Sequence, residues 1–158
     1  MNNKSGKPVS TSAVSIAQLM LPEHANPLGN VHGGLIMKLA DEAGSLAAVR
    51  HAGRHSVTVF IDSMTFEEPV HVGELLHLYA QLSWVGRSSM EVVVKVESEN
   101  PITGSRAETN SAYIVYVALG ENGRTTQVPP LICETEEQRK RMDAGEKRQR
   151  YRLSLQRK

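Results

Sequence analysis

The chain has 158 residues, 40% of them hydrophobic and 22% charged, which is typical of one globular domain with a core of its own. The formal net charge of +1 at pH 7 argues against nucleic acid as the principal partner. One cysteine, Cys133, excludes an internal disulfide and a thiolate metal cluster, and no run approaches the roughly 18 apolar residues that cross a membrane.

The first third of the chain predicts a disordered start, one strand, a glycine-rich loop and one long helix. Residues 1–11 are polar and lack a hydrophobic signal segment, so we expect them to be disordered and the protein to be cytoplasmic. A strand is expected over 14–21, ended by Pro22. A helix is expected from Gly33 to about His51, with a length of roughly 30 Å at 1.5 Å per residue.

The middle of the chain predicts four strands joined by short turns. They are expected over residues 56–66, 74–85, 88–98 and 107–119. In the second of them, alternate residues from Leu76 to Trp84 are expected to face inward together. One long helix with antiparallel hairpins describes an α+β fold, in which the helix covers one face of a curved sheet.

Residues 134–158 predict a charged C-terminal helix. This tail has nine Lys or Arg residues against five Asp or Glu residues, and its spacing is typical of a solvated helix rich in i,i+4 ion pairs. The alternative is a basic rim that attracts a phosphorylated ligand or a partner subunit. We therefore divide the chain into a disordered segment 1–11, a domain 12–133 and a helical tail 134–158.

The predicted long helix carries a candidate catalytic residue, Asp41. At 100° per residue, a wide apolar face is expected to pack on the sheet, and a second stripe contains Asp41 as its only charge. Small and apolar neighbours around a carboxylate indicate close approach by another chain or by an acyl ligand. The wide face comprises Leu35, Ile36, Leu39, Ala40, Ala43, Leu46 and Ala47, and the second stripe comprises Met37, Asp41, Gly44 and Ala48.

Several other chemistries lack their motifs. His51 and His55 have the i,i+4 spacing of a helical zinc pair, but no third ligand accompanies them, and we expect no metal. The sequence contains no Gly-x-Ser-x-Gly elbow of serine hydrolases, no phosphate-binding P-loop and no dinucleotide fingerprint. We therefore expect no bound cofactor.

The run from His24 to Gly34, followed by residues 37–44, resembles the hotdog-fold acyl-CoA thioesterases. It is most similar to the branch that contains YciA-type bacterial hydrolases and the brain-type cytosolic acyl-CoA hydrolase, and residues 85–89 and 128–130 match that branch as well. The resemblance implies a single hotdog domain, with a long central helix wrapped by a curved antiparallel sheet. It also implies a homodimer joined sheet edge to sheet edge and assembled further into a trimer of dimers.

The resemblance implies an enzyme that hydrolyses fatty acyl-CoA to free acid and CoA, so that CoA is part of the substrate. The resemblance implies that Asp41 and Asn30 are the catalytic residues, and that each site combines Asp41 of one subunit with Asn30 of the other. Asp41 would activate water or attack the thioester directly. Asn30 alone is also compatible with a loop residue that caps the helix. Backbone amides near Gly33 and Gly34 are expected to bind the thioester carbonyl.

The resemblance places further substrate contacts outside the helix. His32 is expected at the thioester or as a residue that holds the loop, and Arg87, Ser88 and Ser89 are expected to contact the phosphates or the pantetheine of CoA. Two other functions are compatible with the fold. One is a hydratase or dehydratase that uses His32 with Asp41, and the other is an acyl-CoA sensor without catalysis.

Overall fold

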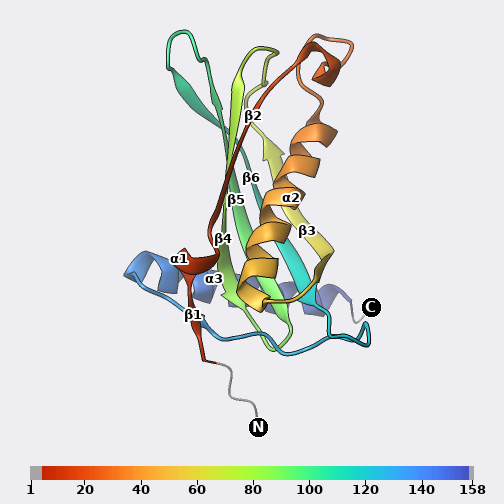
Figure 1. The fold of residues 1–158 in the computed structure, drawn as a ribbon, viewed down its shortest axis with the longest axis vertical. Helices are drawn as coiled ribbons and strands as arrows, with labels where there is room; N and C mark the ends of the chain where they lie inside the picture. The colour runs from red at the N-terminus through yellow and green to blue at the C-terminus, as the bar shows by residue number, and fades with distance from the viewer. Residues whose placement is uncertain (1–4, 157–158) are drawn as a thin grey trace.

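The computed structural model describes residues 5–156, and its main element is a five-stranded sheet in the order β2-β4-β5-β6-β3 (Figure 1). Every neighbouring pair in this sheet is antiparallel. Its strands are β2 (Val14–Leu19), β3 (Ser56–Phe66), β4 (Leu75–Val85), β5 (Ser89–Glu99) and β6 (Arg106–Ala118). The other elements are β1 (Lys7–Pro8), α1 (Val9–Ser12), the 3-10 helix η1 (Pro22–His24), α2 (Gly33–Ala52), β7 (Leu131–Ile132) and α3 (Glu136–Leu155).

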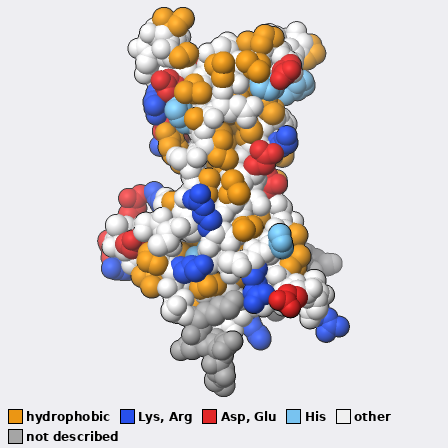
Figure 2. Space-filling model, in the orientation of Figure 1, with side chains coloured by type: hydrophobic (Ala, Val, Ile, Leu, Met, Phe, Trp, Pro, Cys, Tyr) orange, Lys and Arg blue, Asp and Glu red, His pale blue; other side chains and the backbone are white. Residues whose placement is uncertain are grey.

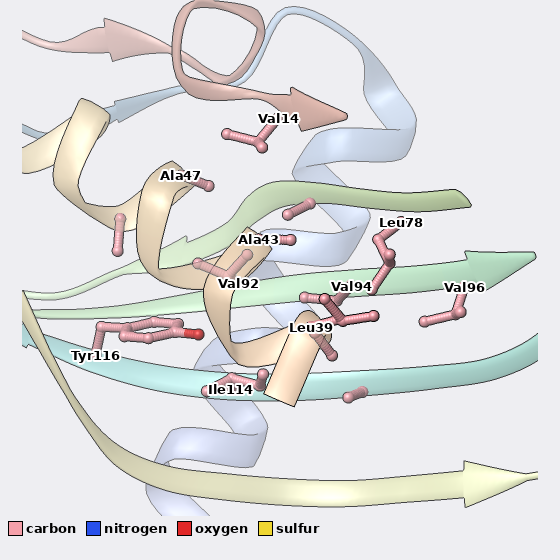
Figure 3. Packing of buried hydrophobic residues seen from close by; sticks show 14 of the residues in the cluster. Val14, Leu39, Ala43, Ala47, Leu78, Val92, Val94, Val96, Ile114 and Tyr116 are labelled. Carbon is pink, nitrogen blue, oxygen red and sulfur yellow. The ribbon is translucent and has the colours of Figure 1, made fainter. Parts of the chain in front are cut away.

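The core lies between α2 and the face of the sheet that curves around it (Figures 1 and 3). Alternate residues of β4 and β5 point toward α2 and are almost fully buried, which confirms the predicted α+β fold with a long central helix. Within residues 5–156, no helix is both long enough and apolar enough to cross a membrane. The inward residues of the two strands are Leu76, Leu78, Ala80, Leu82, Met90, Val92, Val94 and Val96.

The prediction that Trp84 faces inward was wrong. A register shift between Leu82 and Trp84 interrupts the alternation of β4, so that Trp84 pairs with Glu91 of β5 on the opposite face of the sheet. There its side chain lies so close to α3 that a Cβ added at Gly145 would be 2.5 Å from the Trp84 Cβ. A one-residue irregularity has therefore moved the tryptophan from the core to the contact with the C-terminal helix.

The buried face of α2 is shifted from the one predicted. Gly44 and Ala48, which were expected to meet another chain or a ligand, are buried within this chain, and Gly44 faces Tyr116 of β6. Leu46, expected against the sheet, is 49% exposed. The curved sheet reaches around one side of the helix, so the Gly44 side is covered and the Leu46 side faces outward. Of the predicted second stripe, Met37 and Asp41 remain partly accessible.

The N-terminal segment is ordered further than predicted. Lys7 and Pro8 form β1 in a parallel pair with β7, and α1 follows directly. Ser10 donates to the Glu134 carboxylate from both its backbone N–H and its hydroxyl, at 2.9 and 2.7 Å. The predicted disorder of residues 7–11 was therefore wrong, since polar residues here bond to the segment before α3. Residues 1–4 lie outside the described residues.

The C-terminal helix packs on the outer face of the sheet, opposite α2 (Figure 1). The predicted i,i+4 ion pairs are present on its exposed side, between Arg141 and Glu137 and between Arg150 and Glu146. The prediction of a fully solvated helix was wrong, because Arg152 is 4% exposed and its neighbour Arg148 is half-buried. The sequence of the helix has few apolar residues, because buried ion pairs together with the Trp84 side chain of β4 attach it to the sheet.

A buried cluster of charges attaches α3 to the sheet. The carboxylate of Glu91, 0% exposed, accepts hydrogen bonds from Arg148 at 2.7 and 3.0 Å and two from Arg152 at 2.9 Å. Arg152 also donates to Asp62 of β3 at 2.9 Å, so the cluster joins β5, β3 and α3. Burial opposes ionisation of Glu91, yet hydrogen bonds from the arginines and from Ser83 hold the pKa of its carboxyl below its ordinary value.

We predict that Glu91→Gln lowers the free energy of unfolding by about 3–5 kcal/mol, because both arginines would lose their buried partner. The matched control is Glu137→Gln, which breaks an exposed ion pair on the same helix and should cost less than about 1 kcal/mol. Urea titrations at equal protein concentration measure both values. Equal losses for the two variants would contradict a structural role for the buried cluster.

Candidate active site

The loop before α2 is fixed by backbone bonds and by one asparagine side chain. Asn26 accepts, through Oδ1, the N–H groups of Leu28 at 2.9 Å and of Asn30 at 3.2 Å. The N–H of Asn26 donates to the carbonyl of Asn30 at 2.6 Å, and Gly29 turns the chain with a φ of +84°. The loop therefore reaches α2 in one defined conformation. The sequence pointed to Asn30 here and gave no reason to consider Asn26.

Two glycines begin α2, and their backbone N–H groups are free. His32 precedes the helix, and its side chain makes no capping bond. Among residues 5–156, the N–H groups of Gly33 and Gly34 have no hydrogen-bond partner. A Cβ at Gly34 would meet no atom within 4 Å, whereas one at Gly33 would lie 3.2 Å from the Phe66 ring. The positive end of the helix thus opens beside an aromatic ring, where it can receive a polarised oxygen.

Asp41 lies two turns along α2, and one of its carboxylate oxygens is anchored by two hydroxyl groups. Its Oδ1 accepts the hydroxyl of Thr58 in β3 at 2.7 Å and that of Tyr116 in β6 at 3.1 Å. Within the described chain, the second oxygen, Oδ2, has no hydrogen-bond partner. The side chain is half-buried. The carboxylate is therefore fixed through one oxygen and free to accept a proton through the other.

Asp41 and the glycine amides are too far apart to act on one carbonyl within a single chain. The eight residues from Gly33 to Asp41 correspond to about 12 Å along the helix axis. A thioester carbonyl bound at the amides would need a water or a carboxylate within about 3.5 Å. The chain alone thus provides two half-sites, one at each position.

The predicted phosphate-binding residues lie at the opposite end of α2 from its glycines. Ser89 pairs with Val117 of β6, at the end of the sheet where β3 begins after the C-terminus of the helix. A 20-residue helix is about 30 Å long, so Arg87, Ser88 and Ser89 are remote from Gly33 within one chain. Arg87 is exposed at its hairpin turn. These residues can meet the loop before α2 (residues 25–32, the glycine loop) only across an interface between subunits.

The strand β3 forms an exposed edge of the sheet, because it has a neighbour, β6, on one side only. An edge strand with apolar side chains on its surface is typical of a subunit interface. More apolar side chains are exposed near the glycine loop, and hydrophobic surface gathers at the upper end of the face in Figure 2. The exposed residues of β3 are Val57, Val59, Phe60, Ile61 and Phe66, and those near the loop are Leu19, Leu21, Leu28 and Val72.

His51 and His55, which were considered as a zinc pair, lie in different surroundings. His51 is fully buried, and its Nε2 lies 2.8 Å from the carbonyl oxygen of Pro129. Burial lowers the pKa of His51, so the ring is a neutral structural group at the end of α2. His55 is exposed in the turn after the helix. Over residues 5–156, no group of three or more His, Cys, Asp or Glu side chains is arranged to hold a metal ion.

Neither hydroxyl partner of Asp41 is predicted by the sequence. Thr58 lies 17 positions and Tyr116 75 positions further along the chain. Each alternates with other residues in an ordinary strand pattern, so no local motif distinguishes it. The small residue Gly44, one turn after Asp41, is the one sequence feature that could have indicated a side chain packed closely against this part of the helix.

Comparison with known proteins gives consistent matches over most of the chain. Residues 28–105 match the family described as "Thioesterase superfamily". The chain is 37% identical over 135 residues to the "Uncharacterized acyl-CoA thioester hydrolase YkhA" of Bacillus subtilis, covering 85% of this chain and 75% of that protein. It is 34% identical over 142 residues to the human "Cytosolic acyl coenzyme A thioester hydrolase", covering 89% of this chain. The chain spans 37% of the length of that human relative.

Solved structures of similar sequence have the same fold. The crystal structure of an apo-hexameric acyl-CoA thioesterase superimposes with a TM-score of 0.91 at 34% identity, over 96% of this chain and 97% of the other. An acyl-CoA hydrolase of Staphylococcus aureus, solved with butyryl coenzyme A, coenzyme A and coenzyme A disulfide, gives a TM-score of 0.88 at 29% identity. That match covers 95% of this chain and 92% of the other. Alanine variants of an asparagine, an aspartate and a threonine of the Staphylococcus enzyme have also been solved.

Proposed function

Because this chain belongs to the thioesterase superfamily of hotdog-fold proteins, we propose that it is an acyl-CoA thioesterase, which hydrolyses fatty acyl-CoA to free acid and CoA. The observation that carries this proposal is the half-buried Asp41 carboxylate, with one oxygen anchored and the other free. The names of the relatives and the coenzyme A complexes of the Staphylococcus enzyme support the choice of substrate. The cytosolic name of the human relative supports a cytoplasmic location.

The proposed reaction is attack of water on the thioester carbonyl. The amides of Gly33 and Gly34 donate to the carbonyl oxygen, on which negative charge develops, and a missing donor of this kind typically costs 10²–10³ in rate. The free oxygen of Asp41 takes a proton from water as the water oxygen bonds to the carbonyl carbon. The carbon–sulfur bond then breaks, and the CoA sulfur leaves and is protonated. Direct attack by Asp41, followed by hydrolysis of the anhydride, is the alternative route.

We propose that each complete site is shared between two subunits of a homodimer. The separation of Gly33 and Asp41 by about 12 Å along the helix axis supports a site in which the glycine loop of one subunit faces Asp41 of the other. The exposed apolar edge of β3 supports a dimer joined along that edge. The hexameric relatives support further assembly into a trimer of dimers.

We further propose that two asparagines of the glycine loop act at the site. In the Staphylococcus variants, the replaced asparagine stands fifteen positions before the aspartate and the threonine seventeen positions after it. The same intervals from Asp41 lead to Asn26 and Thr58, which have the same residue types. We assign to Asn26 Nδ2 a hydrogen bond to the thioester or to the attacking water, since its Oδ1 is occupied within the loop. Asn30, three positions before Gly33, remains our second donor.

The remaining contacts that we propose concern the polar part of the substrate. Arg87, Ser88 and Ser89 are assigned to the phosphates or the pantetheine of CoA bound at the partner's glycine loop, which a twofold dimer would bring near them. His32 is assigned to the thioester region. Residues 12–133 form the catalytic domain in this proposal, and 134–158 form a tail that packs on it.

We predict that Asp41→Asn lowers kcat for acyl-CoA hydrolysis by about 10²–10⁴, the range expected when a general base is lost. Release of free thiol from acyl-CoAs of increasing chain length measures the rate. Glu42→Gln is the matched control, because Glu42 is the next residue of α2 but is exposed and pairs only with Lys38 among the described residues. Near-normal turnover by the Asp41 variant would end this assignment, and binding of acyl-CoA without thiol release by the native protein would favour a sensor.

We expect Asn26→Ala, like Asp41→Asn, to lose most of its activity, and we predict that the two variants restore activity when combined in one dimer. A mixed dimer has one site with both residues intact, so random exchange at equal amounts should give about a quarter of the native specific activity. Two affinity tags allow the mixed dimer to be isolated after refolding together or after co-expression. An isolated mixed dimer no more active than its parents would contradict a site shared in this way.

We predict that Arg87→Ala raises KM for acyl-CoA about fivefold with little change in kcat, as expected for ~1 kcal/mol from an exposed ion pair. Raising the salt concentration should increase the KM of the native protein and affect the variant less, because salt screens the attraction to phosphate. Arg150→Gln, on the exposed side of α3, is the control. A salt-independent KM in the native protein would argue against phosphate binding by Arg87.

A further inference from the structure

Tyr116 connects the sheet to the carboxylate of Asp41 from beneath the helix. Its side chain leaves β6 on the face covered by α2, is 0% exposed, and points its hydroxyl toward the helix (Figure 3). The hydroxyl oxygen lies 3.1 Å from Oδ1 of Asp41 and 3.0 Å from the backbone carbonyl oxygen of the same residue. One phenol thus contacts both the side chain and the backbone of the proposed general base.

The phenol reaches Asp41 because Gly44 has no side chain. A Cβ added at Gly44 would overlap the Tyr116 hydroxyl oxygen and would lie 3.1 Å from Cζ and 3.2 Å from Cε2 of the ring. Glycine in the interior of a helix costs about 1 kcal/mol relative to alanine. Gly44 stands near the middle of α2, and its φ does not require glycine. Its contribution is therefore the space that it leaves for the Tyr116 ring.

The direction of the hydrogen bond follows from the state of the phenol. Burial, and in addition the charge of the neighbouring Asp41 carboxylate, raise the pKa of Tyr116 far above its ordinary value. The hydroxyl therefore stays protonated throughout the working range of the protein, and its one hydrogen is shared between Oδ1 and the backbone carbonyl oxygen of Asp41. With Thr58 as second donor, Oδ1 contacts two hydroxyl groups, whereas Oδ2 has no hydrogen-bond partner among the described residues.

We propose that Tyr116 is a positioning residue of the active site, which holds the Asp41 carboxylate through the gap at Gly44 so that its free oxygen faces the attacking water. This inference rests on the proposed function. Displacement of a reacting group by about 1 Å costs on the order of 10²-fold in rate, so loss of a fixed anchor acts on the chemical step. Tyr116 itself does not touch the substrate.

Tyr116→Phe tests the proposal, because it removes the hydroxyl and leaves the ring packed. We expect kcat to fall about 10- to 100-fold while KM for acyl-CoA stays within about twofold, because substrate binding does not involve Asp41 Oδ1. Tyr113→Phe is the matched control. Tyr113 lies on the same strand but on the opposite face of the sheet, where its ring stacks with Arg148. The control should retain native kcat and KM.

Gly44→Ala tests the same contact from the other side. The added methyl group displaces the phenol, so kcat should fall although helix propensity improves. Combined with Tyr116→Phe, the alanine meets no hydroxyl oxygen, so the loss of kcat in the double variant should be clearly smaller than the product of the two single losses. Independent, multiplicative effects would overturn the proposed pairing.

The outcomes separate this inference from the proposed function. If the native protein releases thiol and Asp41→Asn does not, but Tyr116→Phe has native kcat, the function stands and the positioning role is overturned. A fall in kcat that Tyr113→Phe reproduces, or one accompanied by an equal rise in KM, also overturns it, since both indicate general damage. A native protein that hydrolyses no acyl-CoA overturns the function and this inference together.

Discussion

The carboxylate of Asp41, fixed by two hydroxyl groups from different strands, is the interaction on which the proposed chemistry depends. Thr58 belongs to β3 and Tyr116 to β6, so the two donors meet the helix only because the sheet curves around it. The same curvature buries the small residues on this side of α2 and leaves the glycine end of the helix open. A flat sheet could not supply both donors, because β3 would lie too far from the helix.

The outer face of the sheet supports this arrangement through a different kind of contact. Glu91 and Arg152 attach α3 to β5, and Asp62 extends the cluster to β3. The edge strand that carries Thr58 is therefore held from both faces, by Asp41 on one side and by α3 on the other. A buried charge cluster contributes little net stability compared with apolar packing of the same volume. Its hydrogen bonds do, however, require one geometry, and they therefore fix the position of β3, which also forms the proposed interface.

The sequence predicted the elements well because their signals are local. The helix was expected to end near His51 and ends at Ala52, and the strands were placed to within a few residues by their alternation. The failures arose where tertiary contacts override a local pattern, as for Trp84, turned by a register shift, and for Arg152, drawn from solvent by a buried carboxylate. Asp41 was predicted from the sequence and its catalytic role stays a prediction, whereas its contact with Tyr116 was not predicted, because no local spacing reports a contact across 75 positions.

In the proposed mechanism, Asp41 and the glycine amides act on one thioester from opposite sides of a subunit interface. A crystal structure of the native oligomer with a non-hydrolysable acyl-CoA analogue would show whether they do. We expect the carbonyl oxygen of the analogue at about 2.7–3.1 Å from the glycine amides of one subunit, with Asp41 of the other subunit facing the carbonyl carbon. An analogue bound elsewhere, or an Asp41 side chain that faces open solvent far from any second subunit, would contradict it.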